Sequence, residues 1–363
     1  MTNNFGFELG NFTGWSTIGD VEIETSDLGS FPTEGQFQAL LTNGSGSQID
    51  AAIENFFGLN NGSIDGVGNG NATQGSAIQL DSITVEAGDV LSFDFNFLTN
   101  ESTPTFFNDF SFVSINPNPV EELADTNSSF VTSLTNFNEE TDYATFIYEF
   151  PQAGTYEVGI GVVDLIDTIV DSGLLVDNLR VIPADQVILG TDGSESLFGT
   201  VDNDTIFGRG GNDQIFGSEG VNTLYGGEGD DQIFGGSQAD TIYGGRGNDQ
   251  IFASEGNNLV YGGRGNDTIY TGSGDDYVVG GFGSDTIWLG GGEDQVVLQR
   301  GSGFDTVNNF QLDQTTFVVG NSNSLNIADG ANGAEISLFG DLLAVVSNTQ
   351  ASTLVDNIDS VFV

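Results

Sequence analysis

The stretch Gly226-Gly-Glu-Gly-Asp-Asp-Gln-Ile-Phe234 recurs with variations along the middle of the chain, for example as Gly262-Gly-Arg-Gly-Asn-Asp-Thr-Ile-Tyr270. Twelve such units of nine residues fill residues 190–297, and a thirteenth, Arg300–Asn308, follows a slip of two residues. The eighth position is aliphatic in all twelve units. This period does not match a helix, but it fits a three-residue strand followed by a six-residue turn. Two units therefore make one coil, and stacked coils bury the aliphatic positions between two parallel sheets.

The sixth position is acidic in ten of the twelve units and asparagine in the other two. Glycines in the turns can take positive φ, so the backbone can fold tightly and direct carbonyl oxygens inward. Carboxylate and carbonyl oxygens are the ligands that calcium prefers. The units resemble the repeats of the RTX family of calcium-binding β-roll proteins, over about a third of the chain. This resemblance implies that each ion is shared between two loops on the same side, two repeats apart.

The loops of the odd-numbered units, here called the odd column, are intact. Five of them keep both the acid and the fourth-position glycine, which makes four shared sites. The expected ligands are Asp213, Asp231, Asp249, Asp267 and Asp285, with the turn glycines Gly211, Gly227, Gly229, Gly245, Gly247, Gly263, Gly265, Gly281 and Gly283. Glu195 of the first unit would add a weaker site, and Asp305 of the slipped unit another.

The even column, made of the even-numbered units, is eroded. Asn222 and Asn258 replace acids, and the loop before Asp240 lacks its fourth glycine. The last two loops of this column keep both acids and their glycines, namely Asp276 and Asp294 with Gly274 and Gly292, whereas Asp204 follows an interrupted turn. We expect this column to be mostly empty, with the two asparagines hydrogen-bonding within their turns; the alternative is that their amide oxygens still bind calcium. The roll would then hold about 4–7 calcium ions.

Composition excludes many functions. The 363 residues include 53 acids and five arginines, with no lysine, histidine or cysteine, for a net charge of −48. A serine–histidine triad, a thiolate nucleophile and disulfides are therefore impossible within this sequence, and nucleic acid is not an expected partner. No apolar run is long enough to span a membrane. We expect a protein that is not an enzyme, although a pair of carboxylates could still hydrolyse glycosides.

Residues 1–183 alternate apolar and polar residues in many short segments, as in Val90–Phe97 and Ala144–Phe150. This pattern predicts an antiparallel β-sandwich. The segments Phe5-Gly-Phe-Glu8 with Gly14-Trp15, and Val176-Asp-Asn-Leu-Arg-Val181, resemble the jelly-roll domains of carbohydrate-binding modules and of secreted cyanobacterial proteins. The resemblance implies that Glu8 and Asp177 lie near a structural calcium, and that the domain binds polysaccharide.

The whole chain is therefore expected to be all-β, with a sandwich at 1–183, a calcium-binding parallel β-roll at 186–308 and a small β cap at 309–363. The chain starts without an evident N-terminal signal peptide. Its last residues, Asp359-Ser-Val-Phe-Val363, resemble the C-terminal signal of type I secretion substrates. This implies export by type I secretion machinery to the cell surface or extracellular matrix. The alternative to a polysaccharide-binding protein is a purely structural one that binds only calcium.

Aromatic residues occupy the ninth position in ten of the twelve units. Because this position neighbours the inward eighth position, its side chains should point outward. Two interpretations remain open: the rings could shield the ends of short strands, or they could stack sugars or pack against another chain.

Overall fold

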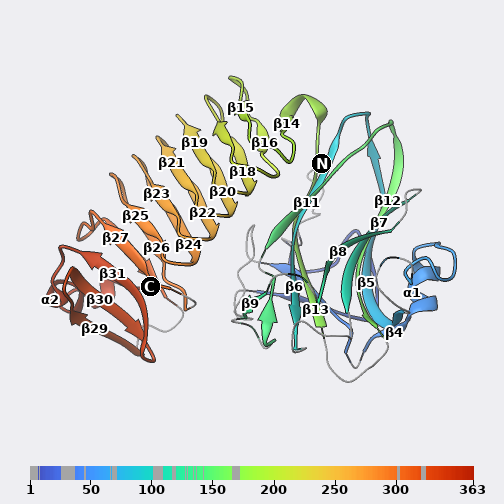
Figure 1. Ribbon diagram of the computed structural model, residues 1–363, viewed down its shortest axis with the longest axis horizontal. Coiled ribbons are helices and arrows are strands. Elements are labelled where there is room, and N and C mark those ends of the chain that lie inside the picture. The colour runs from blue at the N-terminus through green and yellow to red at the C-terminus, as the bar shows by residue number, and fades with distance from the viewer. Residues whose placement is uncertain are drawn as a thin grey trace. The chain divides into compact units, whose positions relative to one another are not determined.

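The computed structural model describes residue 7 and residues 9–25, 37–44, 46–65, 67, 72–100, 109–116, 120–126, 128, 130–133, 135, 137–141, 143–165, 172–300, 303–319 and 324–363. The chain forms two compact units, Met1–Ala184 and Asp185–Val363 (Figure 1). Both are built almost entirely of strands, which confirms the predicted all-β class.

The first unit is a sandwich of two antiparallel sheets, as predicted. The six-stranded sheet has the order β1-β5-β12-β7-β8, with β4 also paired to β5. Its strands are β1 (Trp15–Ile18), β4 (Gln48–Ile49), β5 (Ala72–Val85), β7 (Phe110–Asn116), β8 (Glu121–Asp125) and β12 (Gly154–Leu165). The seven-stranded sheet has the order β2-β3-β13-β6-β10-β9, with β11 also paired to β6. Its strands are β2 (Asp20–Glu24), β3 (Gln38–Thr42), β6 (Val90–Thr99), β9 (Val131–Thr132), β10 (Glu139–Glu140), β11 (Ala144–Glu149) and β13 (Ser172–Ile182).

Alternation along the strands fills the sandwich core. On β6, Phe93, Phe95 and Phe97 belong to the buried cluster between the sheets. A short helix that the alternation did not predict, α1 (Asp50–Phe56), packs near β5 (Figure 1). Just after this helix, Phe57 meets Phe112 of β7 edge to face, with 5.9 Å between ring centroids. A second, smaller apolar cluster therefore lies under the helix.

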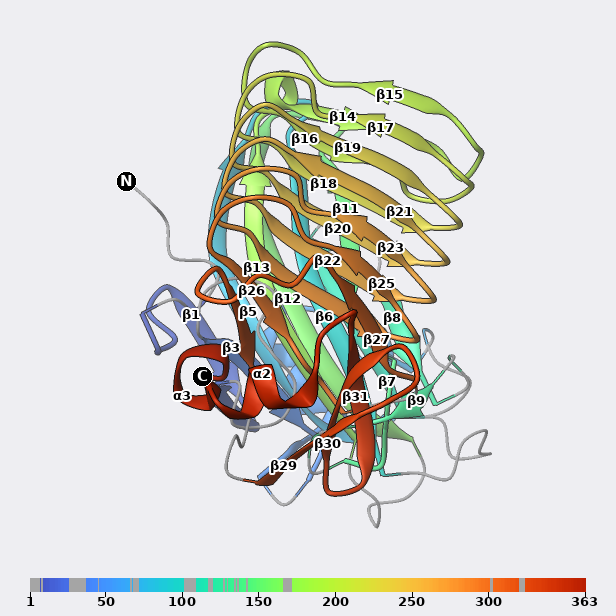
Figure 2. The same cartoon turned by 90° about the vertical axis from the view of Figure 1, so that its left-hand side faces the viewer.

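The second unit contains the roll, whose coils alternate between two parallel sheets (Figure 2). The eight-stranded sheet holds β14 (Val187–Leu189), β16 (Thr205–Phe207), β18 (Thr223–Glu228), β20 (Thr241–Arg246), β22 (Leu259–Arg264), β24 (Tyr277–Phe282), β26 (Asp294–Val297) and β28 (Thr315–Val318). The ten-stranded sheet holds β15 (Ser196–Phe198), β17 (Gln214–Phe216), β19 (Gln232–Gly236), β21 (Gln250–Ser254), β23 (Thr268–Tyr270), β25 (Thr286–Trp288), β27 (Asp305–Asn308), β31 (Asp341–Ser347), β30 (Gly333–Leu338) and β29 (Leu325–Asp329). A short 3-10 helix, η2 (Ala184–Gln186), precedes β14.

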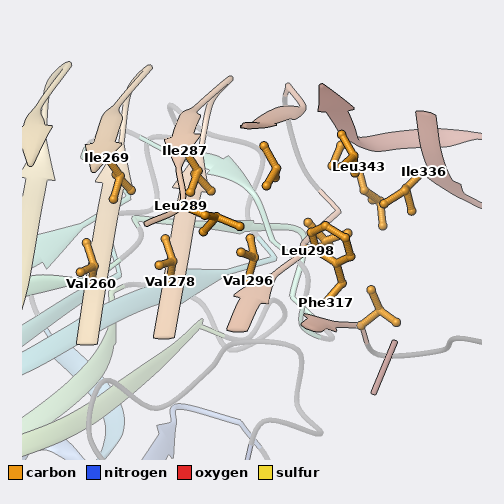
Figure 3. Packing of buried hydrophobic residues seen from close by; sticks show 14 of the residues in the cluster. Val260, Ile269, Val278, Ile287, Leu289, Val296, Leu298, Phe317, Ile336 and Leu343 are labelled. Atoms are coloured by element: carbon orange, nitrogen blue, oxygen red, sulfur yellow. The ribbon is translucent and has the colours of Figure 1, made fainter. Parts of the chain in front are cut away.

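The eighth-position residues form the core of the roll, as the period predicts. From Ile206 to Val296 each is completely buried, whereas Leu197 of the first coil is only partly buried. Figure 3 shows the two rows facing each other across the interior, with Ile269 and Ile287 opposite Val260 and Val278. Each residue fills one level of the stack, so the core depends on neighbouring coils.

Residues 309–363 complete this unit instead of forming a separate compact body. Strand β31 pairs with β27 in parallel, and β29, β30 and β31 form an antiparallel meander. Phe317, Ile336 and Leu343 extend the core of the roll (Figure 3). The helices α2 (Ala351–Val355) and α3 (Ile358–Val361) follow, and Phe362 is buried in the same cluster. In the described part of the chain, no helix is long and apolar enough to cross a membrane.

Candidate metal sites

The sixth-position acids form a regular hydrogen-bonded column. In each odd-column loop, Oδ1 of the acid accepts the backbone N–H of the sixth residue one coil earlier. The donors and acceptors are Glu195 to Asp213, Asp213 to Asp231, Asp231 to Asp249, Asp249 to Asp267 and Asp267 to Asp285, at 2.7–2.8 Å. One oxygen of each of the five aspartates is thereby fixed by the backbone, and the other is free to face a ligand.

The second oxygen, Oδ2, is buried at seven of these acids and has no hydrogen-bond partner among the described residues. The seven are Asp213, Asp231, Asp249, Asp267 and Asp285 of the odd column and Asp240 and Asp276 of the even column. Burying an acceptor without a partner is costly, and burying a charged one is more so. A buried oxygen of this kind, repeated from coil to coil, is a donor that fits a bound cation.

Glycines leave room around these oxygens. An ideal Cβ at the first-position residue Gly226 would lie 2.4 Å from Oδ2 of Asp231, and the same holds within 2.6 Å for Gly208, Gly244, Gly262 and Gly280 with their own acids. At the second and fourth positions, Gly227 and Gly229 have φ of +105° and +122°. A Cβ on either would touch a carbonyl oxygen of the preceding coil at 2.0–2.1 Å. The coils therefore pack at backbone contact, with carbonyls and carboxylates lining each turn.

Burial and mutual repulsion strongly raise the pKa values of most of the sixth-position acids. Desolvation, joined by the negative charges of neighbouring coils, raises the pKa of Asp231 and Asp267 to about 7 and that of Asp249 to about 8. In the even column, desolvation raises the pKa of Asp276 to about 7 and of Asp240 to about 6. A nearby divalent cation would lower these pKa values, because it favours the ionised carboxylate.

The two asparagines of the even column satisfy their own turns. The Nδ2 group of Asn222 lies 3.2 Å from each of three carbonyl oxygens, those of Gly217, Glu219 and Gly220. Asn258 donates in the same way to Gly256 at 3.1 Å. Each Oδ1 still accepts a backbone N–H, from Asp204 and Asp240 respectively. Each amide group thus binds carbonyl oxygens of its own turn, which is the predicted turn bonding.

Both ends of the columns differ from the middle. Oδ2 of Asp204 accepts the N–H and hydroxyl of Thr200, and the carboxylate of Glu195 accepts the same two groups of Thr191. Both loops have threonine at the second position, and the hydrogen bonds of their acids are satisfied within the turn. At the other end, Asp294 and Asp305 accept N–H groups at 3.2 and 3.3 Å, and burial raises the pKa of Asp305 to about 8.

A second ladder at the fifth position was not predicted. Here a side chain accepts the N–H of the residue one coil later, so the direction is opposite to that of the sixth-position ladder. Asn212 accepts from Asp230, Asp230 from Asn248, and Asn248 from Asn266, at 2.7–3.2 Å. The recurrence of Asn, Asp and Ser at the fifth position carried this signal. Each turn is therefore fixed to both of its neighbours.

The candidate calcium ligands of the sandwich are described only in part, because Glu8 lies outside the described residues. Asp177 is fully buried on β13 and pairs in register with Asp94 of β6. Its Oδ1 accepts the N–H of Asn178, and Asp94 accepts both the hydroxyl of Thr145 and the amide of Asn178. Among the described residues, no three acids converge closely enough to hold a metal by themselves. Sites in the roll thus require backbone carbonyls as well.

Comparison with known proteins agrees with the roll geometry. The RTX calcium-binding nonapeptide repeat, a model of four copies, matches residues 189–224, 216–251, 243–278, 252–287 and 270–307. No curated protein is detectably similar in sequence to this chain.

Similar solved structures are remote. TmCBM61 in complex with β-1,4-galactotriose shares 13% identity over 50% of this chain and 96% of its own, with a TM-score of 0.29. A CBM4 structure shares 12% over 48% and 97%, with a TM-score of 0.25. The catalytic domain of a GH87 α-1,3-glucanase in complex with tetrasaccharides shares 9% over 90% and 78%, with a TM-score of 0.32. From the matched repeats and the turn geometry together, residues 189–307 are RTX calcium-binding nonapeptide repeats, and they follow an antiparallel β-sandwich.

Proposed function

We propose that the protein is an extracellular, calcium-stabilised scaffold whose roll folds when it meets calcium. The seven buried Oδ2 atoms without a partner carry this proposal, because each needs a cation to offset its burial. Without metal, the stacked carboxylates repel one another and raise each other's pKa, as at Asp249 between Asp231 and Asp267. Folding and metal uptake are then one process, as in other small metal-dependent domains.

The arrangement of the acids also supports a proposal for how many ions the roll binds. Successive pairs along the odd column, from Asp213 to Asp285, make four intervals of the same construction. Up to three further sites would come from the pairs Asp285–Asp305 and Asp276–Asp294 and from the loop of Asp240. We propose about 4–7 ions in the roll, since calcium needs six to eight oxygens and these loops offer both carboxylates and carbonyls.

Calorimetry of calcium added to the metal-free full chain, with circular dichroism on the same samples, tests this proposal. About 4–7 ions bound together with a gain of β signal would support it. Ten or more ions would mean that the asparagine loops also bind metal. An absence of uptake at millimolar calcium would refute the proposal.

Low calcium inside cells and high calcium outside would keep the roll unfolded before export and fold it afterwards. This fits secretion by type I machinery and a place at the cell surface or in the matrix. A comparison of cells with and without a type I exporter, with the protein measured in the medium, tests the route. Retention of secretion without the exporter would refute it.

We further propose that the sandwich is a polysaccharide-binding module and that the protein has no catalytic activity. The support for the module is the resemblance of Phe5–Glu8 and Val176–Val181 to jelly-roll carbohydrate-binding modules. A glycan array probed with the calcium-loaded protein tests the binding; no bound glycan would leave a purely structural protein. Glycosidase assays on the same sample test the absence of catalysis, and turnover would overturn it.

A further inference from the structure

The outer face of the ten-stranded sheet carries a continuous stack of aromatic rings. We define this ring ladder as Phe198, Phe216, Phe234, Phe252, Tyr270 and Trp288. They are the ninth-position residues of the strands β15, β17, β19, β21, β23 and β25. Neighbouring centroids are 4.9 Å apart over the first five rings and 6.2 Å apart at the last step, with interplanar angles of 3–10°. The parallel register of the strands produces the ladder, because it places the same position of each coil directly above the last.

The rings do not cover each other completely. Parallel carbon planes touch at about 3.5–4.0 Å, so a centroid spacing of 4.9 Å means that each ring normal is inclined by roughly 40° to the ladder axis. The four rings between the two ends of the ladder are half-buried, so part of each is exposed. The end rings are the most accessible, with Phe198 62% and Trp288 39% exposed. On the other sheet, Phe207 and Tyr225 are buried, whereas Tyr243 and Tyr261 are half-buried.

Next to the rings runs a ladder of uncharged polar side chains on the same face. It consists of the seventh-position residues Ser196, Gln214, Gln232, Gln250, Thr268 and Thr286. Gln214 donates to Gln232 through its side-chain amide at 3.3 Å. None of the twelve residues of the two ladders is charged, in a chain that carries 53 acids. The strip therefore offers an uncharged partner a surface without carboxylates.

The size and charge of this strip select the kind of partner. Six strands about 4.8 Å apart and three residues wide make a strip of roughly 300 Å². A stable protein interface needs about 800 Å² on each side, so the strip is too small for a second copy. Two copies would also repel, because each carries a net charge of −48. The same charge repels an anionic polymer.

We propose that the two ladders bind a neutral, linear polysaccharide that lies along the axis of the roll. The inclined rings offer apolar contacts to the C–H faces of the sugars, and the glutamine and threonine side chains offer hydrogen bonds to their hydroxyls. The partner meets the same contacts at every coil, with a repeat close to the length of one sugar ring. This surface lies outside the sandwich and goes beyond the function proposed above.

Co-sedimentation of the calcium-loaded full chain with microcrystalline cellulose, insoluble β-1,3-glucan and insoluble α-1,3-glucan tests this inference. We expect at least one of these to retain the protein. Replacing Phe216, Phe234 and Phe252 together by leucine should weaken the association constant by about tenfold. The matched control replaces Tyr225, Tyr243 and Tyr261 by leucine on the other sheet and should bind like the wild type.

A further variant separates binding from folding. Replacing Gln214, Gln232 and Gln250 by alanine leaves the rings intact and should weaken binding about threefold, with unchanged circular dichroism and calcium uptake. Undiminished binding by the variant that lacks the three phenyl rings would overturn the inference and leave binding to the sandwich untouched. Failure of all three polysaccharides to retain the wild type would overturn it too, as would self-association that these ring replacements abolish.

Discussion

Replacing Asp249 by asparagine should make the metal-free roll more stable while it removes calcium sites. Asp249 lies in the middle of the odd column, where its Oδ1 accepts the N–H of Asp231 and its Oδ2 is buried without a partner. Asparagine keeps the accepting oxygen and presents an amide to the loop carbonyls, as Asn222 does at three of them. The change removes a buried charge without changing the shape of the side chain.

The size of the effect follows from the pKa of Asp249. Burial raises that pKa from 3.8 to about 8 in the folded roll. One pKa unit corresponds to about 1.4 kcal/mol, so at about pH 7.5 this carboxyl opposes folding by on the order of 5 kcal/mol without metal. Relaxation and water entry reduce this figure, and we expect the variant to gain about 2–4 kcal/mol in free energy of unfolding.

Urea unfolding followed by circular dichroism in a chelator measures this gain, and calorimetry counts the ions. Because Asp249 borders the intervals toward Asp231 and Asp267, the variant should bind up to two fewer ions. The control is Asp192→Asn, the same change at an exposed acid of the first unit, which is expected to shift stability by less than about 0.5 kcal/mol. A metal-free Asp249→Asn chain that is less stable than the wild type, or an unchanged ion count, would show that the reasoning is wrong.

Other measurements probe the same turns. In chelator, the roll should gain stability as the pH falls from about 8 to about 5. In the folded roll, Asp231, Asp249 and Asp267 have pKa values of about 7, 8 and 7, compared with 3.8 in the unfolded chain. The folded state therefore binds more protons than the unfolded state in that pH range. Circular dichroism at the two pH values checks this, and greater stability at the higher pH would contradict it. Replacing Asn222 by aspartate should add one ion in calorimetry and cost the metal-free roll about 1–3 kcal/mol, since three amide contacts are lost; an unchanged ion count would argue against the even-column assignment. Gly229→Ala should cost about 3 kcal/mol or more even with calcium, because φ is +122° and the new Cβ would lie 2.1 Å from a carbonyl oxygen; an unchanged melting temperature would exclude the close coil contact.

Much of the roll could be predicted because each position of the nine-residue repeat has the same surroundings in every coil. The aliphatic eighth position predicted the two parallel sheets. Assigning the sixth-position residues to the odd and even columns separated Asp231 and the other odd-column acids from Asn222 and Asn258. The hydrogen bonds of Asn222 to its own turn follow from amide chemistry and the spacing of the loop. These features depend on local sequence and on the repeat alone.

The rest depended on contacts that spacing does not encode. The bonds of Thr200 to Asp204 and of Thr191 to Glu195 join a second-position hydroxyl to an acid, and only the folded turn shows that they meet. The unpartnered oxygen of Asp240 occurs in a loop without its fourth glycine. Likewise, β31 pairs with β27 although the paired residues, such as Asp305 and Ala344, are 39 apart in the sequence, because the open end of the core has to be covered.

The two opposed hydrogen-bond ladders restrict how this protein can change in length. A fifth-position side chain accepts from the coil after it and a sixth-position side chain from the coil before it, each at a separation of 18 residues. Duplication or loss of 18 residues keeps every later turn on its own side and in its own ladder. Duplication or loss of nine would move all later turns to the opposite sheet, so that Asn258 would interrupt the metal-binding column. Such genes should therefore grow and shrink by pairs of repeats.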